Sequence, residues 1–361
     1  MGSTEKRCSV CILPGAFPNI SFDEQGRCNH CRNTADKKAD VAKEKAVYRG
    51  KFTGLLETVL NHPGRGDRPY DILMAYSGGK DSTYTLSLLK REFGLRVLAL
   101  SFDNGFVSQA AMGNIRRVTG SLGVDHILFS PRWDLLKKIF SASARREFYP
   151  RKAIERASNI CTSCMGIVKA VCLKTAIEMD IPMIGFGWSP GQAPLQSSIM
   201  KNNPALVKAA QRAFLGPFTE IAGGDVKAWF LSERHYDEPE RFPYNIHPMA
   251  WEYYNEQMIL NEIRAFGWTA PEDTDTNSTN CLLNALANDI HLKRYRFHPY
   301  VWEIANMVRE GIMTREEGYR KIYTGQPAEM IGLGRWVQPE SQARIVRSIA
   351  EVLPFRDGRA A

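Results

Sequence analysis

Short apolar runs alternate with longer amphipathic segments between residues 70 and 190. The apolar runs cover residues 72–75, 97–100, 126–129 and 182–186, and helical segments begin after Asp81 and near Ile115. Continuous apolar strands that alternate with helices are typical of a parallel sheet covered on both faces. The pattern therefore predicts an α/β domain with a parallel sheet over residues 70–195.

The remaining chain divides by composition. Residues 1–34 carry four cysteines, and residues 35–69 predict a helical connector that ends in a segment rich in Gly and Pro. Strand signals fade after residue 195, so residues 196–361 predict a mainly helical region that binds the acceptor. Within it, Thr314 and Glu317 have the spacing of a capping box at a helix start.

Overall composition fits an ordinary globular protein, with 44% hydrophobic and 24% charged residues. We find no continuous apolar run of the ~18 residues that a membrane span needs, and the N-terminus lacks the apolar core of a signal peptide. We therefore expect a cytoplasmic protein without a membrane partner. The formal net charge of +8 favours anionic ligands such as nucleotides, RNA or a nucleotide-linked sugar.

Basic residues gather between Arg132 and Arg156, where eight of them stand against three acidic ones. This segment is either an anion-binding surface or a solvated helix face. The basic and aromatic run over residues 293–298 has three interpretations: contact with RNA, a clamp for a sugar nucleotide, or an ordinary helix end.

A glycine-rich segment follows the first predicted strand and begins the next helix. In that setting, backbone N–H groups and the helix dipole bind an anion, and glycines let the backbone approach it. The spacing is not that of a Walker loop, which disfavours an enzyme that cleaves the γ-phosphate. We expect ATP here, with Lys80 and Asp81 as catalytic residues and the whole segment binding the nucleotide: Ser77, Gly78, Gly79, Lys80, Asp81 and Ser82.

Two further segments follow predicted strands and so belong to the same carboxyl edge of the sheet, where open α/β folds bind ligands. Asp103 is a candidate contact for the nucleotide or Mg²⁺, although an Asp-Asn-Gly sequence is also ordinary turn chemistry. Gly187 and Trp188 begin a glycine-rich loop that we expect to line the adenylate or acceptor pocket.

Eight cysteines in a cytosolic chain favour metal binding or catalysis over disulfides. The first four form two CxxC pairs separated by sixteen residues, a spacing that predicts a closed structural Zn²⁺ site without catalytic function: Cys8, Cys11, Cys28 and Cys31.

A second group combines the pair Cys161 and Cys164 with the distant Cys281. Three thiolates can hold a four-iron, four-sulfur cluster (4Fe-4S) with one iron open to an external ligand such as sulfide. The alternatives are a catalytic persulfide or redox thiols, with Cys161 and Cys281 as the catalytic residues, or buried cysteines that act as small hydrophobes. Cys172 lies in a helical pattern and is expected in the core.

The glycine-rich segment resembles the PP-loop of the PP-loop ATP pyrophosphatase (adenine nucleotide alpha hydrolase-like) superfamily. This resemblance implies a HUP-like fold, cleavage of ATP between its α- and β-phosphates, and transfer of AMP to an oxygen of the acceptor. The spacing of the second cysteine group is also similar to that of iron-sulfur enzymes that thiolate tRNA.

Further segments resemble the N-acetyl sugar amidotransferase branch of that superfamily. They are residues 8–11, 21–31, 122–126, 161–164, 267–268, 271–273, 281 and 309–317. Residues 188–192 and 295–300 differ from that branch, and both belong where an acceptor should bind.

The resemblance implies nitrogen transfer to a sugar or sugar nucleotide, and it requires a separate glutaminase partner because the chain has no recognisable glutaminase domain. Sulfur transfer to tRNA or a small molecule, from a sulfur donor protein, is the alternative. A nucleotide sensor or RNA-binding protein without turnover is the third class, and a homodimer is compatible with each.

Overall fold

A computed structural model describes residues 6–33, 41–192, 194–272, 274 and 277–324. Residues 35–40 of the predicted connector, Asp273 and residues 325–361 of the predicted helical region lie outside this part of the chain. The strands are β1 (Ile72–Ala75), β2 (Val97–Phe102), β3 (Asp125–Phe129), β4 (Met183–Phe186), β5 (Ile199–Lys201) and β6 (Tyr244–Ile246).

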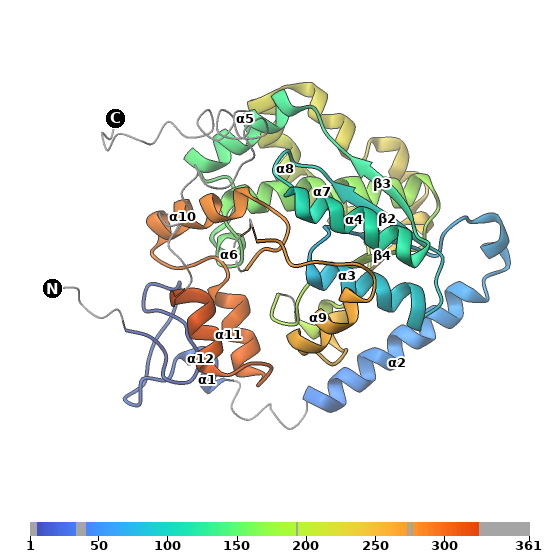
Figure 1. Cartoon of the computed structure of the whole chain (residues 1–361). Coiled ribbons are helices and arrows are strands. Elements are labelled where there is room, and N and C mark those ends of the chain that lie inside the picture. The colour runs from blue at the N-terminus through green and yellow to red at the C-terminus, as the bar shows by residue number, and fades with distance from the viewer. Residues whose placement is uncertain (1–5, 34–40, 193, 273, 275–276, 325–361) are drawn as a thin grey trace.

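Helices surround the strands (Figure 1). The α-helices are α1 (Asn29–Arg32), α2 (Val41–Leu60), α3 (Lys80–Ser87), α4 (Gln109–Leu122), α5 (Trp133–Arg145), α6 (Arg151–Ile154), α7 (Asn159–Glu178), α8 (Pro204–Ala222), α9 (Glu256–Arg264), α10 (Leu283–Tyr295), α11 (Val301–Arg309) and α12 (Arg315–Tyr319). Thr314 and Glu317 form the expected capping box at the start of α12.

The described strands form one sheet in the order β3-β2-β1-β4-β6-β5. All neighbours run parallel except β5, which pairs antiparallel with β6 at the edge. The α/β fold class is therefore confirmed, and the four predicted strands are present within two residues of their expected ends.

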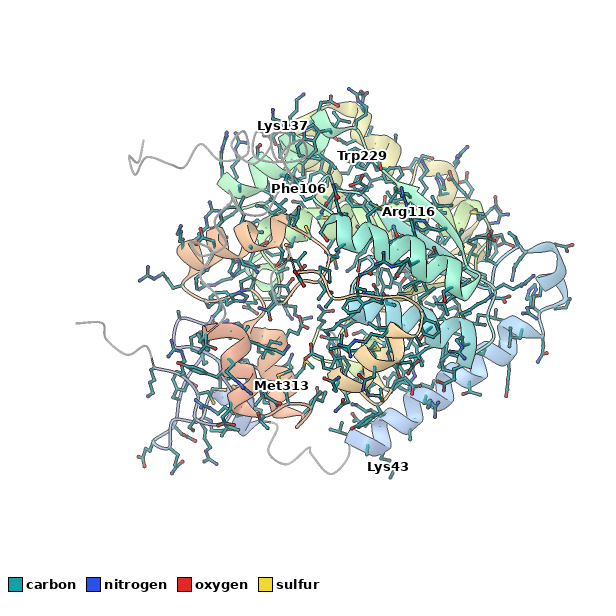
Figure 2. The ribbon with its side chains drawn as sticks, viewed as in Figure 1. Lys43, Phe106, Arg116, Lys137, Trp229 and Met313 are labelled. Atoms are coloured by element: carbon teal, nitrogen blue, oxygen red, sulfur yellow. The ribbon has the colours of Figure 1, made fainter. Side chains whose placement is uncertain are left out.

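Helices bury both faces of this sheet. Leu73, Leu98 and Ile184 pack with α5, α7 and α8 on one face, whereas Ile72 and Met74 pack with α2, α3, α4 and α9 on the other. Phe106 and Trp229 lie in the first of these cores, and Lys43 and Arg116 are exposed on outer helix surfaces (Figure 2). Burial of both faces explains why β1, β2 and β4 are continuously apolar, whereas Ile127 and Leu128 of the edge strand β3 are exposed.

Strands β5 and β6 come from the region in which we expected mainly helices. Each has three residues, and β6 is the sequence Tyr-Asn-Ile, which is too short and too polar to show a strand pattern. Pairing with β4 makes β6 a strand, so the sheet includes segments from both sides of residue 195.

Helix α7 is the one described helix long and apolar enough to cross a membrane, with a mean hydropathy of 1.6. More than half of it is buried, against β1, β4 and α5. A buried core helix of a globular protein has this composition, so the helix fits the interior in which it lies.

The N-terminal module packs on the C-terminal helices rather than on the sheet. Its apolar residues share a core with Val301 and Ile304 of α11. The Arg315 guanidinium donates to the carbonyl oxygens of Cys8 and Cys11, and the Tyr323 hydroxyl donates to that of Ile12. The two ends of the described chain therefore stabilise each other.

A buried carboxylate fixes the entry to β1. Asp71 is 1% exposed and accepts hydrogen bonds from the guanidinium groups of Arg65 and Arg96 at 2.8–3.2 Å, and from the backbone N–H of Arg96. Burial raises the pKa of Asp71, but the bonds from Arg65 and Arg96 outweigh burial and hold this pKa well below its usual range.

We expect Asp71→Asn to lower the free energy of unfolding by about 2 kcal/mol at pH 7, because the two guanidinium groups lose a charged acceptor. Since the folded-state pKa is lowered, the contribution is present above the unfolded pKa of about 4 and is lost as the pH falls below it. Urea unfolding at pH 7 and pH 3 measures both effects. The exposed Asp67→Asn is the control, and an equal loss in both variants would contradict the prediction.

Candidate functional site

The loop between β1 and α3 has the geometry expected of a phosphate-binding turn. Gly78 has φ +77°, and a Cβ there would lie 2.8 Å from the carbonyl oxygen of Ala111. The Ser77 and Ser82 hydroxyls lie 3.0 Å apart, and Gly79 precedes the first turn of α3. The expected nucleotide-binding residues Ser77, Gly78, Gly79 and Ser82 are therefore brought together at one helix N-terminus.

A small cavity lies beside this turn. The Lys80 ammonium bonds the Asp81 carboxylate at 2.9 Å and the Tyr254 hydroxyl at 2.8 Å, and lies 3.7 Å from a Glu256 oxygen. Burial lowers the pKa of Lys80, but the carboxylates of Asp81 and Glu256 raise it above its usual value. Lys80 is therefore a fixed cation beside the loop.

The loop after β4 lies directly against the start of α3. A Cβ on Gly187 would lie 2.3 Å from Cα of Ser82, so only glycine fits there. Next in the chain, Trp188 stacks on His247 with ring centres 4.4 Å apart. The structure thus brings the 187–192 loop to the PP-loop segment.

Helix α11 holds the far side of the same loop. The Glu303 carboxylate accepts hydrogen bonds from the Ser189 hydroxyl and the Gln192 side chain, and Asn306 donates to the carbonyl oxygen of Gly191. Burial raises the pKa of Glu303. Glu303 also lines the cavity that contains Lys80 and Asp81.

Sequence reasoning missed the residues that complete this cavity. Tyr254, Glu256, Thr279 and Glu303 are separated from the loop by more than 170 residues and belong to no local motif. The resemblance gave some signal: the segments compared with the amidotransferase branch include Ser189, Tyr300 and Met313, which line the cavity, and Trp268, whose indole donates to the carbonyl oxygen of Gly78 at 3.0 Å.

Asp103 lies at the carboxyl edge, as its position after β2 predicts. One of its carboxylate oxygens accepts from the Gly105 backbone at 2.9 Å, and the other accepts from the Ser130 hydroxyl at 3.3 Å. The first bond is a local turn contact and the second joins the loops after β2 and β3, so a role toward nucleotide or Mg²⁺ stays a prediction.

The second cysteine group converges around two asparagines. The Asn104 amide lies 3.7 Å from Sγ of Cys164 and 3.5 Å from Sγ of Cys281, and the Asn284 amide lies 3.7 Å from Sγ of Cys161. Burial raises the pKa of all three thiols, that of Cys161 to about 11. Three thiols at one place fit a three-cysteine cluster site. Cys172 is fully buried in the core.

The N-terminal cysteines fit a tetrahedral metal site. All four Sγ atoms lie within 4.8 Å of one another, at 3.7 Å for Cys8 and Cys31 and 3.8 Å for Cys11 and Cys28. Tetrahedral zinc with Zn–S bonds of about 2.3 Å requires S–S separations of about 3.8 Å. Backbone N–H groups of Val10, Cys11 and Cys28 point at Sγ of Cys8. The donor set therefore suits Zn²⁺.

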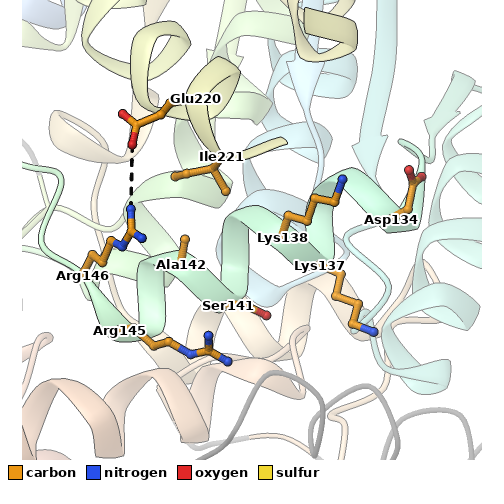
Figure 3. A pocket seen from close by; sticks show the side chains of 9 residues that line it. All are labelled: Asp134, Lys137, Lys138, Ser141, Ala142, Arg145, Arg146, Glu220 and Ile221. Carbon is orange, nitrogen blue, oxygen red and sulfur yellow. Dashed lines mark ion pairs between the residues drawn. The ribbon is translucent and has the colours of Figure 1, made fainter. Parts of the chain in front are cut away.

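The basic segment forms α5 and α6, away from the glycine-rich loop. Figure 3 shows Lys137, Lys138, Arg145 and Arg146 around a hollow between α5 and α8, together with Asp134 and Glu220. Arg146 lies 3.8 Å from Glu220. Carboxylates thus accompany the cations on this surface.

The 293–298 run makes contacts within the protein. Lys293 pairs with Asp289, Arg294 donates to the carbonyl oxygen of Ala144, and Phe297 is buried. These contacts fit the interpretation of a helix end.

No family model matches the chain. An uncharacterized protein of Methanocaldococcus jannaschii is 21% identical over 318 residues, which are 88% of this chain and 92% of that protein. The tRNA-specific 2-thiouridylase MnmA of Halothermothrix orenii is 30% identical over 129 residues, which are 32% of this chain and 34% of that protein. The chain thus matches about a third of the thiouridylase.

Two solved structures align over most of their length, each with a TM-score of 0.35. One is the U34-tRNA thiolase NcsA of Methanococcus maripaludis with its iron-sulfur cluster, which is 15% identical and covers 86% of this chain and 89% of that chain. The other is the NMN synthetase of Francisella tularensis, which is 10% identical and covers 76% of this chain and 96% of that chain. Scores this low carry no weight for the fold or the function. The glycine-rich motif, its position between β1 and α3 and the thiouridylase alignment are independent of them. Together these observations support the PP-loop ATP pyrophosphatase superfamily. We refer to the turn over residues 77–82 as the PP-loop.

We expect Gly187→Ala to weaken binding of α,β-methylene ATP by at least about tenfold, because the added Cβ displaces the backbone of Ser82 and small displacements in a site are costly. Calorimetric titration measures the affinity, and thermal unfolding checks that the variant is folded. Gly120→Ala, where a Cβ meets nothing within 4 Å, is the control. Unchanged affinity in a folded Gly187→Ala variant would show that the contact is irrelevant to the nucleotide.

Proposed function

We propose that the chain is an ATP-dependent transferase that adenylates an acceptor oxygen, releases pyrophosphate and then displaces AMP. The PP-loop supports this proposal, since its two serine hydroxyls meet at the N-terminus of α3, beside a cavity that Lys80 and Asp81 line. In the first step, the acceptor oxygen attacks the α-phosphorus and pyrophosphate leaves. In the second, a nucleophile attacks the activated carbon and AMP leaves with the oxygen.

Each part of the site has a role in this scheme. Ser77, Gly78, Gly79 and Ser82 hold the phosphates, and the fixed ammonium of Lys80 offsets the charge of the leaving pyrophosphate. Asp81 and Asp103 are the candidate ligands of Mg²⁺. Gly187 and Trp188 line the acceptor side.

The nucleophile defines two versions of the proposal. In the first version, nitrogen from a separate glutaminase is transferred to an N-acetyl sugar or sugar nucleotide, which the resemblance of residues 8–317 favours. In the second, sulfur from a donor protein is transferred to tRNA or a small molecule. The convergence of Cys161, Cys164 and Cys281 favours this version.

Two metal groups belong to the proposal. Cys8, Cys11, Cys28 and Cys31 would hold Zn²⁺ as a structural ion without an open position. Cys161, Cys164 and Cys281 would hold a 4Fe-4S cluster whose open iron binds sulfide. The chain itself positions these thiols through Asn104 and Asn284.

Pyrophosphate release tests the enzyme. We expect release from ATP in the presence of an N-acetyl sugar nucleotide with ammonium, or of tRNA with sulfide, and a loss of at least about a hundredfold in Asp81→Ala, because Lys80 and the proposed Mg²⁺ lose their carboxylate. Asp67→Asn is the control. Pyrophosphate release that is absent with every acceptor, or unchanged in Asp81→Ala, would refute the proposal.

The metal content of the purified protein distinguishes sulfur transfer from nitrogen transfer. If sulfur is transferred, anaerobically purified protein should be brown with about four irons and one zinc, and Cys281→Ser should lose the iron but keep the zinc. Cys11→Ser should lose the zinc but keep the iron. Metal analysis and visible absorption measure both, and a colourless protein that holds zinc alone would favour nitrogen transfer.

A further inference from the structure

Three side chains from separate segments meet beyond the carboxyl ends of β4 and β6. Lys169 comes from the middle of α7, Trp188 follows β4, and His247 follows β6 directly. The Lys169 ammonium lies 4.5 Å from the centre of the Trp188 ring, and the Trp188 and His247 rings stack with an interplanar angle of 16°. We refer to these three residues as the Lys169 cluster.

The ammonium of Lys169 lacks a counter-ion. No carboxylate pairs with it in the described ranges of the chain, and its side chain is exposed although α7 is a core helix. Surrounding atoms nevertheless desolvate the amine, which lowers the pKa of Lys169 to about 8. Protein atoms therefore surround the amine, although part of the Lys169 side chain reaches solvent.

His247 also lacks a partner. Its side chain is 5% exposed, and its Nδ1 atom is buried without a hydrogen bond from any described residue. Burial and the charge of Lys169 lower the pKa of His247 to about 3, so the ring is neutral. A buried polar atom without a partner costs about 1–3 kcal/mol, which a ligand oxygen would offset.

The Lys169 cluster lies on segments that also carry parts of the PP-loop site and of the second cysteine group. Trp188 adjoins Gly187, whose backbone touches Ser82 of the PP-loop. Lys169 follows Cys164 by five residues on α7, about 7.5 Å along the helix axis. The acceptor must reach both the adenylate and the source of the nucleophile, and the cluster lies on two segments, the 187–192 loop and α7, that lead to them.

We propose that the Lys169 cluster binds a phosphate group of a small acceptor. Lys169 pairs with a phosphate oxygen, His247 shares a hydrogen bond with the same ligand, and Trp188 holds both side chains in place. A single recessed amine with two half-buried or buried rings suits one phosphate of a small molecule rather than the many exposed phosphates of a nucleic acid. This inference rests on the proposed function, because it assigns the acceptor side of that site.

The test compares N-acetylglucosamine 1-phosphate with N-acetylglucosamine, titrated into the full-length protein saturated with α,β-methylene ATP. We expect the phosphorylated sugar to bind at least tenfold more tightly at pH 7. Lys169→Met should remove this difference, and Lys169→Arg should keep it. Lys174→Met, on the same helix, is the matched control.

The response to pH gives a second readout. Between pH 7 and pH 9 the wild-type affinity for the phosphorylated sugar should fall by up to about tenfold as the amine loses its proton, whereas Lys169→Arg should not respond. The titratable group beside Lys169 in this cluster is His247, which is neutral throughout this range.

Three results would overturn the inference: equal affinity for both sugars, no effect of Lys169→Met, or a loss in Lys169→Met that affects the ATP analogue rather than the sugar phosphate. Binding is measured without turnover. If pyrophosphate release depends on Asp81 but Lys169→Met has no effect on sugar phosphate, this inference fails and the proposed function stands. If sugar phosphate binds as expected but pyrophosphate is never released, the proposed function fails.

Discussion

The contact between the backbones of Gly187 and Ser82 is the constraint on which the site depends. It joins the carboxyl end of β4 to the first turn of α3, and any side chain at position 187 would separate them. Because β1 and β4 are neighbours in the sheet, their following loops emerge side by side. The PP-loop and the 187–192 loop thus form one surface, and Glu303 of α11 fixes it from the other side.

Two different parts of the chain build this surface. The sheet and its first helices supply the PP-loop, whose geometry depends on local sequence. Segments after residue 245 supply Tyr254, Glu256, Thr279 and Glu303, which enclose the cavity. The core thus fixes the turn over residues 77–82, whereas the cavity beside this turn is closed by loops and C-terminal helices.

Sequence patterns predicted the parts of the structure whose cause is local. Continuous apolar runs gave β1 to β4, and the strand-to-helix context of Ser77–Ser82 gave the anion-binding turn. The short strand β6 could not be predicted, because its pairing with β4 and not its composition makes it a strand. The partners of Lys80 were likewise invisible, since Tyr254 and Glu256 reach it only through folding. Cysteine spacing suggested two groups. The convergence of the second group, Cys161, Cys164 and Cys281, around Asn104 and Asn284 could be seen only in the fold.

The docking of the N-terminal module on the C-terminal helices has a consequence for biosynthesis. Its carbonyl groups at Cys8, Cys11 and Ile12 accept from Arg315 and Tyr323, more than 300 residues away. A chain made from its N-terminus onward exposes this surface until the segment with Arg315 and Tyr323 has left the ribosome. The four thiols can capture a metal early, because their ligands are close in sequence, but α11 and α12 arrive last. The same late helix α11 sets Glu303 against Ser189, so the cavity beside the 77–82 turn is completed only after α11 has been made.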